Sequence, residues 1–175
     1  NFLLAAGLDT VIDYLENLRF TDSDITYLAT LPIFKSDFLD YLRHFRFTGN
    51  LYALPEGTPF FVDEPILEVE APLPQAQLIE TFVMNQIHIQ TLLATKALRV
   101  VEAAKARPVV DFSARRIHGT DAAIKGARAF TIGGVNGTSN VMAGKQYGIS
   151  VAGTGAHAYI PTPPTGADAI RAFTK

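Results

Sequence analysis

The sequence predicts an α/β fold in two parts: a domain of helices and short strands over residues 1–106, then the first part of an α/β barrel over residues 107–175. Three observations indicate this fold. Apolar residues recur at helical spacing through the first part of the chain, and residues 75–106 contain neither glycine nor proline. After Pro108, short apolar runs alternate with segments of helix length, a pattern typical of parallel strands joined by helices.

Three helices are expected near the start of the chain. Residues 8–18 carry apolar side chains at helical spacing, which predicts the first. Residues 21–24 are of the types that cap helices, so a short second helix should follow. Ser36 and Asp37 can cap a third helix, which carries apolar residues as far as Phe45.

The middle of the chain changes character twice. Residues 51–73 alternate between apolar and polar side chains and are punctuated by prolines, as expected of short strands with tight turns. Residues 75–106 should then form one long helix. Its apolar residues lie on several faces, so we expect it to be buried on more than one side.

The barrel part should contain three parallel strands and the helices that connect them. Because a barrel of this kind closes with eight strands, three strands predict an incomplete barrel. The expected strands are residues 109–112, 129–132 and 149–152, and the expected helices are residues 121–128, 139–147 and 166–175.

Composition excludes several classes of function. The chain has 175 residues, 48% hydrophobic and 18% charged, and its net charge of -2 argues against nucleic acid or a membrane surface as a partner. The absence of cysteine excludes disulfides and thiol nucleophiles. Charged and polar side chains interrupt the longest apolar stretch, residues 78–101, so it should not span a membrane. No secretory signal is visible, and we expect a cytoplasmic protein.

The chain starts at Asn1, without an initiator methionine, and apolar residues follow at once. Native termini are more often polar and frayed. We therefore expect the chain to begin inside a longer polypeptide and to end inside it, and the incomplete barrel supports the same expectation.

Polar and glycine-rich residues follow the expected strands, where α/β barrels hold their ligands. Arg115 and Arg116 come after the first strand and offer fork-shaped cations to phosphate or carboxylate oxygens. Gly133 and Gly134 come after the second and let a ligand approach the backbone.

Further candidates lie beyond these glycines. Thr138 or Ser139 could start the next helix, and free amides at a helix start bind anions. His157 comes after the third strand, with Gly153 and Gly155 shortly before it, where it could act as a nucleophile or as an acid and base. Together the three strand ends indicate a polyanionic substrate at the mouth of the barrel.

Each feature also has an ordinary structural explanation. Paired arginines are usually surface ion-pair partners, a glycine cluster is usually a turn, and a lone histidine is more often structural than catalytic. Their occurrence at three successive strand ends favours a binding site.

Three blocks of sequence resemble consecutive signatures of the nicotinate phosphoribosyltransferase family. They are Phe-Ser-Ala-Arg-Arg at residues 112–116, Gly-Thr-Ser-Asn-Val-Met-Ala-Gly-Lys at residues 137–145 and Val-Ala-Gly-Thr-Gly-Ala-His-Ala-Tyr at residues 151–159. Residues 53–57, 78–81 and 93–97 are similar to further blocks of the family. The resemblance covers nearly the whole chain in one order. It implies an internal piece of a type II phosphoribosyltransferase whose N-terminal and C-terminal parts are missing.

The resemblance also implies an enzyme of NAD biosynthesis. Members of the family join nicotinate to phosphoribosyl pyrophosphate, which yields nicotinate mononucleotide and pyrophosphate. ATP hydrolysis is coupled to this reaction through a phosphorylated histidine. The implied cofactor is Mg²⁺, the implied co-substrate is ATP, and the implied assembly is a homodimer with a shared active site.

The family's functional residues match positions of this sequence. Phe112 matches the aromatic residue that stacks on the pyridine ring, and Ser113 lies beside it as a substrate-binding residue. Arg115 matches the arginine near the ring and the phosphate, with Arg116 as a second cation. His157 matches the histidine that ATP phosphorylates.

The resemblance extends to the nucleotide pocket and to the choice of base. Gly133, Gly134 and Thr138 match the region that lines the nucleotide pocket. Ser139 bears on the base, because the related nicotinamide enzyme carries an aspartate at the matching position. A serine hydroxyl can donate to the nicotinate carboxylate, which an aspartate would repel. Nicotinate is therefore the expected substrate.

Two alternatives stay open. The enzyme could use another pyridine base, nicotinamide or quinolinate. The chain could instead be a non-catalytic binding or scaffold relative, an alternative kept open by Gly155 and Ala158, where the family often has methionine and serine.

Overall fold

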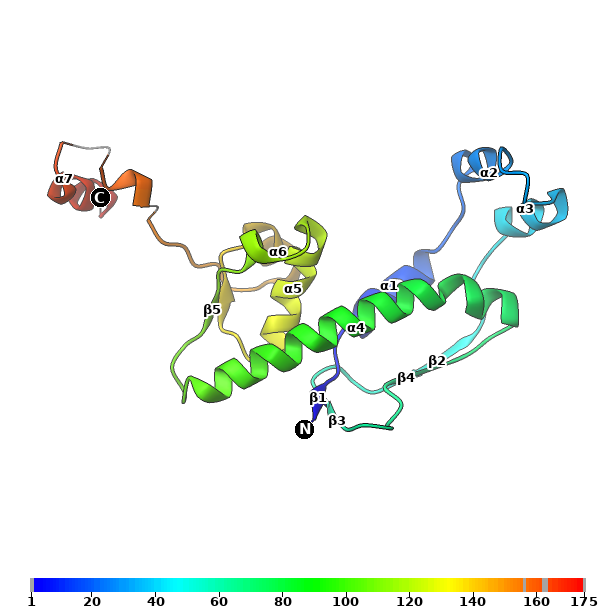
Figure 1. The fold of residues 1–175 in the computed structure, drawn as a ribbon, viewed down its shortest axis with the longest axis horizontal. Coiled ribbons are helices and arrows are strands. Elements are labelled where there is room, and N and C mark those ends of the chain that lie inside the picture. The colour runs from blue at the N-terminus through cyan, green and yellow to red at the C-terminus, as the bar shows by residue number, and fades with distance from the viewer. Residues whose placement is uncertain (1, 156, 162–163, 175) are drawn as a thin grey trace.

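The computed structural model describes residues 2–155, 157–161 and 164–174 of the chain. The helices are α1 (Leu8–Asn17), α2 (Asp22–Leu28), α3 (Ser36–Arg43), α4 (Leu73–Ala103), α5 (Thr120–Ile132), α6 (Val141–Tyr147) and α7 (Gly166–Phe173). The strands are β1 (Leu3–Leu4), β2 (Asn50–Ala53), β3 (Pro59–Phe60), β4 (Leu67–Glu70), β5 (Val110–Asp111) and β6 (Gly137–Thr138). Two short 3-10 helices are η1 (Ala114–Arg116) and η2 (His157–Tyr159). Figure 1 shows α4 as the spine of an elongated molecule.

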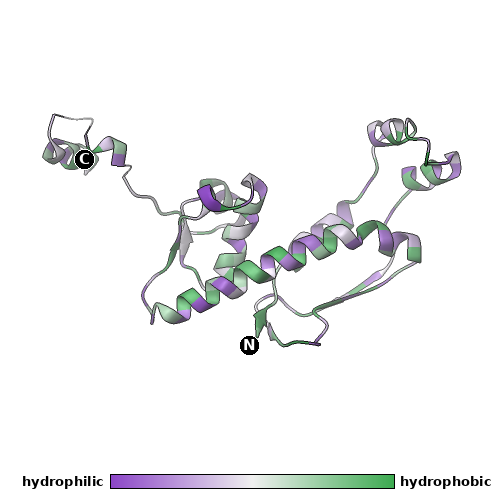
Figure 2. Cartoon of the chain, viewed as in Figure 1, coloured by the Kyte–Doolittle hydropathy of each residue, from purple (hydrophilic) through white to green (hydrophobic). Residues whose placement is uncertain are grey.

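Helix α4 is buried on more than one side, which confirms the expectation from its sequence. One buried cluster joins it to α1 and comprises Val11, Leu15, Ile79 and Val83. On the side of β1, Thr95 Oγ1 accepts a hydrogen bond of 2.9 Å from the Leu4 amide, and the Thr91 hydroxyl donates to the Ala6 carbonyl at 3.1 Å. Figure 2 shows hydrophobic and hydrophilic residues alternating along this helix. The buried threonines satisfy backbone groups that an entirely apolar face would leave unpaired.

Strands β2, β3 and β4 lie where short strands are expected, whereas β1 is not predicted by the sequence. Strand β2 pairs with β4, with Leu51 opposite Val69, and β1 pairs with β3, with Leu3 opposite Phe60. Leu51 and Val69 also pack on the α1–α4 cluster. This contact holds the β2–β4 pair against the two helices.

Helices α2 and α3 form a small cluster of their own around three buried residues, Ile25, Leu39 and Leu42. Thr21 caps α2 in a reciprocal arrangement with Asp24, as the sequence predicts. The expected cap of α3 is wrong, because Lys35 occupies the N-cap position and Ser36 is already the first helical residue. No side chain makes a capping hydrogen bond there.

The second half of the chain contains three parallel extended segments. In the β5–β6 pair, Asp111 lies opposite Thr138, and Thr138 forms a further parallel bridge to Val151. Helix α5 connects the first segment to the second, and α6 connects the second to the third. The predicted alternation of parallel segments and helices is therefore confirmed, but the strand expected at residues 149–152 is only a single bridge at Val151.

The strand expected at residues 129–132 is wrong. These residues form the last turn of α5, and the second parallel strand begins only at Gly137. Alanine is a strong helix former, and Ala129 is fully buried in one cluster with Ala94 of α4. Packing against α4 therefore extends the helix to Gly133, which lies at its C-cap.

Beyond Val151 the chain leaves the sheet. It leads to η2 and α7, which stand apart from the rest of the molecule in Figure 1. Helix α7 confirms the helix expected at residues 166–175, although it ends at Phe173 and Lys175 lies outside the described residues. Over the described ranges, no helix combines the length and the apolar character that crossing a membrane requires.

Candidate active site

Two buried polar side chains join the carboxyl ends of β5 and β6. Thr138, only 1% exposed, donates a hydrogen bond from Oγ1 to Asp111 Oδ2 at 2.8 Å. The other carboxylate oxygen of Asp111, Oδ1, accepts from the Ser113 amide at 2.8 Å. Asp111 is 9% exposed, and a carboxylate at that depth is tolerated when its oxygens are hydrogen bonded, as both are here.

The turn after β5 presents its side chains to solvent. A hydrogen bond of 2.7 Å from the Arg116 amide to the Ser113 carbonyl closes η1. Phe112 is 45% exposed, and Arg115 and Arg116 are exposed as well. One strand end therefore offers an aromatic face and two guanidinium groups, which suit a flat ring that carries acidic groups.

Ser139 lies at the neighbouring strand end. Its amide donates to the Asp111 carbonyl at 2.8 Å, which extends the pairing of β5 and β6 by one hydrogen bond. The structure thus brings Ser139 next to the turn that holds Phe112 and Arg115. The sequence predicts these residues at successive strand ends, but the strand that places Ser139 is β6 and not the one expected at residues 129–132.

Asn140, rather than Thr138 or Ser139, caps α6. Its Oδ1 accepts a hydrogen bond of 3.1 Å from the Ala143 amide, and its own amide donates to Thr138 Oγ1 at 3.0 Å. The expectation that Thr138 or Ser139 starts this helix is therefore wrong by one or two residues. The hydroxyl of Thr138 instead links a strand end to the helix cap.

Gly133 and Gly134 lie at the amino end of β6, so the expected place of both residues after a strand is wrong. A Cβ atom on Gly133 would lie 2.5 Å from the Ala94 carbonyl oxygen and 2.7 Å from the Ala97 Cβ. Gly134 adopts a φ of 92°, which disfavours other residues. Both glycines serve the close packing of α5 on α4 and the turn that follows. Their match to the family's nucleotide pocket stays a prediction.

His157 opens η2, in the segment that leaves the sheet. Its side chain is exposed, and Figure 1 shows η2 apart from the ends of β5 and β6. His157 therefore belongs to a segment that is separate from β5 in Figure 1. Its phosphorylation by ATP stays a prediction.

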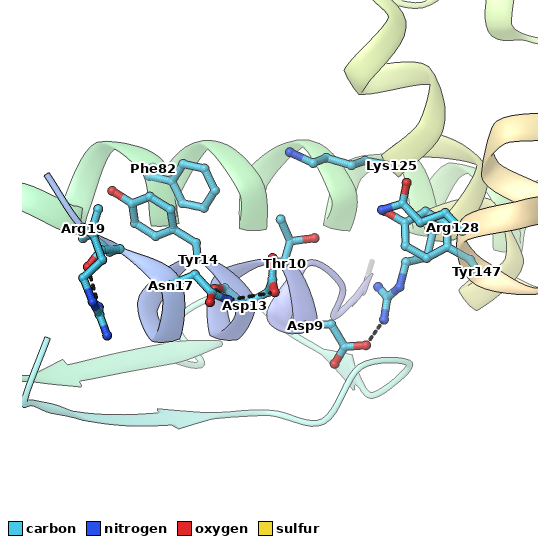
Figure 3. Close-up of a pocket in the computed structure, with 12 residues that line it drawn as sticks. Asp9, Thr10, Asp13, Tyr14, Asn17, Arg19, Phe82, Lys125, Arg128 and Tyr147 are labelled. Carbon is cyan, nitrogen blue, oxygen red and sulfur yellow. Dashed lines mark hydrogen bonds and ion pairs between the residues drawn. The ribbon is translucent and has the colours of Figure 1, made fainter. Parts of the chain in front are cut away.

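A pocket of about 710 Å³ lies between α1, α4, α5 and α6, and the sequence does not predict it. Figure 3 shows Tyr14 and Phe82 stacked on one side of it, with ring centroids 3.7 Å apart. Lys125 Nζ lies 5.9 Å from the Phe82 ring centroid, within reach of a cation–π contact. The lining includes acidic and basic side chains, namely Asp9, Asp13, Arg19, Lys125 and Arg128.

Arg128 connects three distant segments at the edge of this pocket. Its guanidinium donates to Glu56 Oε1 at 3.0 Å, to Glu56 Oε2 at 2.6 Å and to Asp9. Glu56 Oε1 also accepts from the Gly7 amide at 2.6 Å, at the start of α1. Burial acts to raise the pKa of Glu56, but hydrogen bonds and the charge of Arg128 outweigh it and lower that pKa. Sequence reasoning missed this pair because no local pattern marks two residues 72 positions apart.

The βαβ units and the aromatic and cationic strand ends fit the barrel part of a type II phosphoribosyltransferase. Residues 1–88 match the nicotinate phosphoribosyltransferase (NAPRTase) N-terminal domain. The chain belongs to the nicotinate phosphoribosyltransferase family.

Individual relatives agree with this assignment. The chain is 50% identical over 175 residues to a nicotinate phosphoribosyltransferase of Mycobacterium tuberculosis, covering 100% of this chain and 38% of that protein. It is 50% identical over 159 residues to that of Bacillus subtilis, covering 91% of this chain and 32% of that protein.

Two solved structures share the fold. Human nicotinic acid phosphoribosyltransferase superposes with a TM-score of 0.84 at 33% identity, over 92% of this chain and 33% of that one. A nicotinate-nucleotide pyrophosphorylase from Pyrococcus furiosus gives a TM-score of 0.79 at 28% identity, over 100% of this chain and 37% of that one. The chain therefore spans only between 32% and 38% of the length of these four proteins.

Proposed function

We propose that this chain is part of an enzyme that transfers the phosphoribosyl group of phosphoribosyl pyrophosphate to nicotinate, in the salvage route to NAD. The products are nicotinate mononucleotide and pyrophosphate. One observation carries the proposal: the 2.8 Å bond from the Ser139 amide to the Asp111 carbonyl, which places Ser139 at the end of β5, where the turn of Phe112 and Arg115 begins. The names of the relatives support the same reaction.

The chemistry asks little of a general base. The pyridine nitrogen of nicotinate already has a free lone pair, which forms the new bond to the ribose carbon while pyrophosphate leaves with the old bonding pair. Positioning and electrostatic stabilisation can then supply most of the rate. Phe112 would stack on the pyridine ring, with Ser113 beside it. Arg115 and Arg116 would balance the phosphate charges.

Ser139 would select the acid. Its hydroxyl can donate a hydrogen bond to the carboxylate of nicotinate, whereas an aspartate at the same place can only accept one at neutral pH. An aspartate would repel the carboxylate and would suit the amide of nicotinamide instead. The side chain of Ser139 therefore supports nicotinate over nicotinamide.

We propose ATP as the co-substrate and His157 as the acceptor of its terminal phosphoryl group. An imidazole nitrogen bonds to phosphorus as ADP leaves, and water later takes the phosphoryl group from the histidine. The exposed position of His157 supports this role, because the acceptor must meet ATP. Thr138, with Gly133 and Gly134, is proposed to lie near the nucleotide only through the resemblance.

The expected Mg²⁺ does not fit a site made by the described residues alone. Among them, no group of three or more histidine, cysteine, aspartate or glutamate side chains is placed to hold a metal ion. Both carboxylate oxygens of Asp111 already accept hydrogen bonds. We propose that Mg²⁺ binds chiefly through substrate phosphate oxygens. We also propose a cytoplasmic homodimer with a shared active site.

The test uses the full-length protein with phosphoribosyl pyrophosphate, ATP and Mg²⁺. Nicotinate, nicotinamide and quinolinate are offered separately, and the mononucleotide products are separated and quantified. We expect nicotinate to be turned over with the highest kcat/KM, and ATP to leave an acid-labile phosphate that His157→Ala abolishes. Preferred turnover of another base would contradict the choice of substrate. No turnover of any base would favour a non-catalytic relative.

A further inference from the structure

We propose that Asp111 is a positioning residue that holds Ser139 in register with the turn of Phe112 and Arg115, and so sets the preference for a carboxylate over an amide. The proposal rests on the proposed function for its substrate. Its geometric part stands on the hydrogen bonds alone.

Asp111 lies at the centre of a set of four hydrogen bonds. Its carbonyl accepts from the Ser139 amide at 2.8 Å, and its Oδ1 accepts from the Ser113 amide at 2.8 Å. Its Oδ2 accepts from the Thr138 hydroxyl at 2.8 Å, and that hydroxyl oxygen accepts from the Asn140 amide at 3.0 Å. One buried residue thus fixes the backbone on both sides of the candidate site.

The roles of donor and acceptor in this set cannot be exchanged. A carboxylate only accepts hydrogen bonds, and both of its partners here are donors. If the turn at Ser113 moved away from β6, Asp111 would keep a buried charge with an unpaired oxygen, which is costly. The turn and Ser139 are therefore held at one separation, as a ligand that spans them requires.

Asp111 acts through its neighbours. At 9% exposure it is nearly closed off from a ligand, whereas Phe112 is 45% exposed. A displacement of about 1 Å between groups that bind one substrate can reduce the rate about a hundredfold. Loss of the set should therefore change the recognition of the base more than it changes folding.

A matched pair of substitutions at Thr138 tests the role. Thr138→Val keeps the shape of the side chain and removes the hydroxyl, whereas Thr138→Ser keeps the hydroxyl. Thr95→Val is the control, because Thr95 is also buried, accepts from the Leu4 amide at 2.9 Å, donates to the Thr91 carbonyl at 2.7 Å and lies outside the site. Asp111→Asn tests the central residue directly, since it keeps the size and loses the second acceptor.

In the full-length enzyme, we expect Thr138→Val and Asp111→Asn to lower the ratio of kcat/KM for nicotinate over nicotinamide about tenfold, mainly through KM for nicotinate. Thr138→Ser should keep the ratio within about twofold of the wild type. Thr95→Val should lower the melting temperature as much as Thr138→Val does and leave the ratio unchanged. An unchanged ratio in both Thr138→Val and Asp111→Asn would overturn the proposal.

Amide hydrogen exchange separates this failure from a failure of the proposed function. In Thr138→Val, the amides of Ser113, Ser139 and Asn140 should exchange faster than in the wild type, while Thr95→Val should leave them unchanged. If these three amides exchanged at the same rate in Thr138→Val as in Thr95→Val, the positioning role would be overturned. A wild-type protein that makes no nicotinate mononucleotide would instead refute the proposed function, and the exchange data would still decide the role of Asp111.

Discussion

Asp111 and Glu56 are both carboxylates withdrawn from solvent, and they organise the molecule in opposite ways. Asp111 accepts only from neutral donors, and the turn that follows it carries the exposed side chains of Phe112, Arg115 and Arg116. Glu56 is paired with a cation, Arg128, and joins segments 49 and 72 residues away. The first acid arranges exposed groups for a ligand, whereas the second ties distant parts of the fold together. Substitutions in the two regions should therefore separate activity from stability.

The largest effect is expected from Arg128→Met, which leaves the Glu56 carboxylate without its cation. The Glu56 side chain is only 14% exposed, and removal of one partner of a buried pair costs about 3 kcal/mol or more. The full-length variant should melt at a lower temperature and keep its kcat/KM at low temperature. Adding Glu56→Gln should restore part of the loss. A melting temperature equal to that of the wild type would show that the pair does not hold the fold.

The next largest effect is expected from Arg115→Ala, which removes a cation from the exposed turn. Loss of one group that stabilises developing charge costs about a hundredfold in kcat, and an exposed side chain contributes little to folding. Steady-state kinetics should therefore show a lower kcat for this variant, whereas thermal unfolding should show a nearly unchanged melting temperature. Arg43→Ala on α3 is the matched control and should change neither. A hundredfold loss of activity in Arg43→Ala as well would show that the effect is not specific to Arg115.

Ser139→Asp should change the choice of base. We expect kcat/KM for nicotinate to fall about tenfold and that for nicotinamide to rise, since about 1.4 kcal/mol of repulsion suffices for such a change. Ser139→Ala removes the hydroxyl without adding a charge, so it should weaken nicotinate and give no gain with nicotinamide. Competition between the two bases in one reaction measures the ratio directly. A ratio that is the same in all three proteins would exclude Ser139 from recognition.

The smallest effect is the pH dependence of the Glu56–Arg128 pair. The pKa of Glu56 is lowered from its ordinary value of 4.5 in the folded protein. A lowered pKa stabilises the fold fully above the unfolded value, and the stabilisation is lost as the pH falls through the folded value. The difference in urea midpoint between the wild type and Glu56→Gln should therefore be constant from pH 7 down to about pH 5 and shrink at lower pH. A difference that grows on acidification would contradict the sign of the shift.

The sequence predicts the helical half of the fold well because the helical spacing of its apolar residues continues over many residues. Helix α4 was expected over residues 75–106 and spans Leu73–Ala103. The parallel strands are harder, since β5 and β6 have two residues each, too few for a period to appear. The apolar run 129–132 suits a strand by composition, but its alanine packs against α4 and keeps it helical.

Part of the candidate site is predictable from the alternation of strands and helices. Arg115 follows the expected first strand, so its place at a strand end could be inferred, whereas Ser139 follows β6 and not the strand expected at residues 129–132. Asp111 could not be assigned a role, because its partner Thr138 lies 27 residues away and only the register of β5 on β6 joins them. The role of Gly133 cannot be inferred from the sequence, because a glycine that leaves room for a ligand and one that leaves room for a helix backbone are the same residue.

The bonds from α4 to the first strand also have a consequence during synthesis. Leu4 and Ala6 depend on Thr95 and Thr91, which follow them by 91 and 85 residues. At about 5–20 residues per second, a ribosome needs roughly 4–18 s to add those partners. One side of the first strand can pair with β3 as soon as residues 59–60 are made, but the side that faces α4 stays without its partners for those seconds. A chaperone that covers this side during translation would protect the chain until α4 emerges.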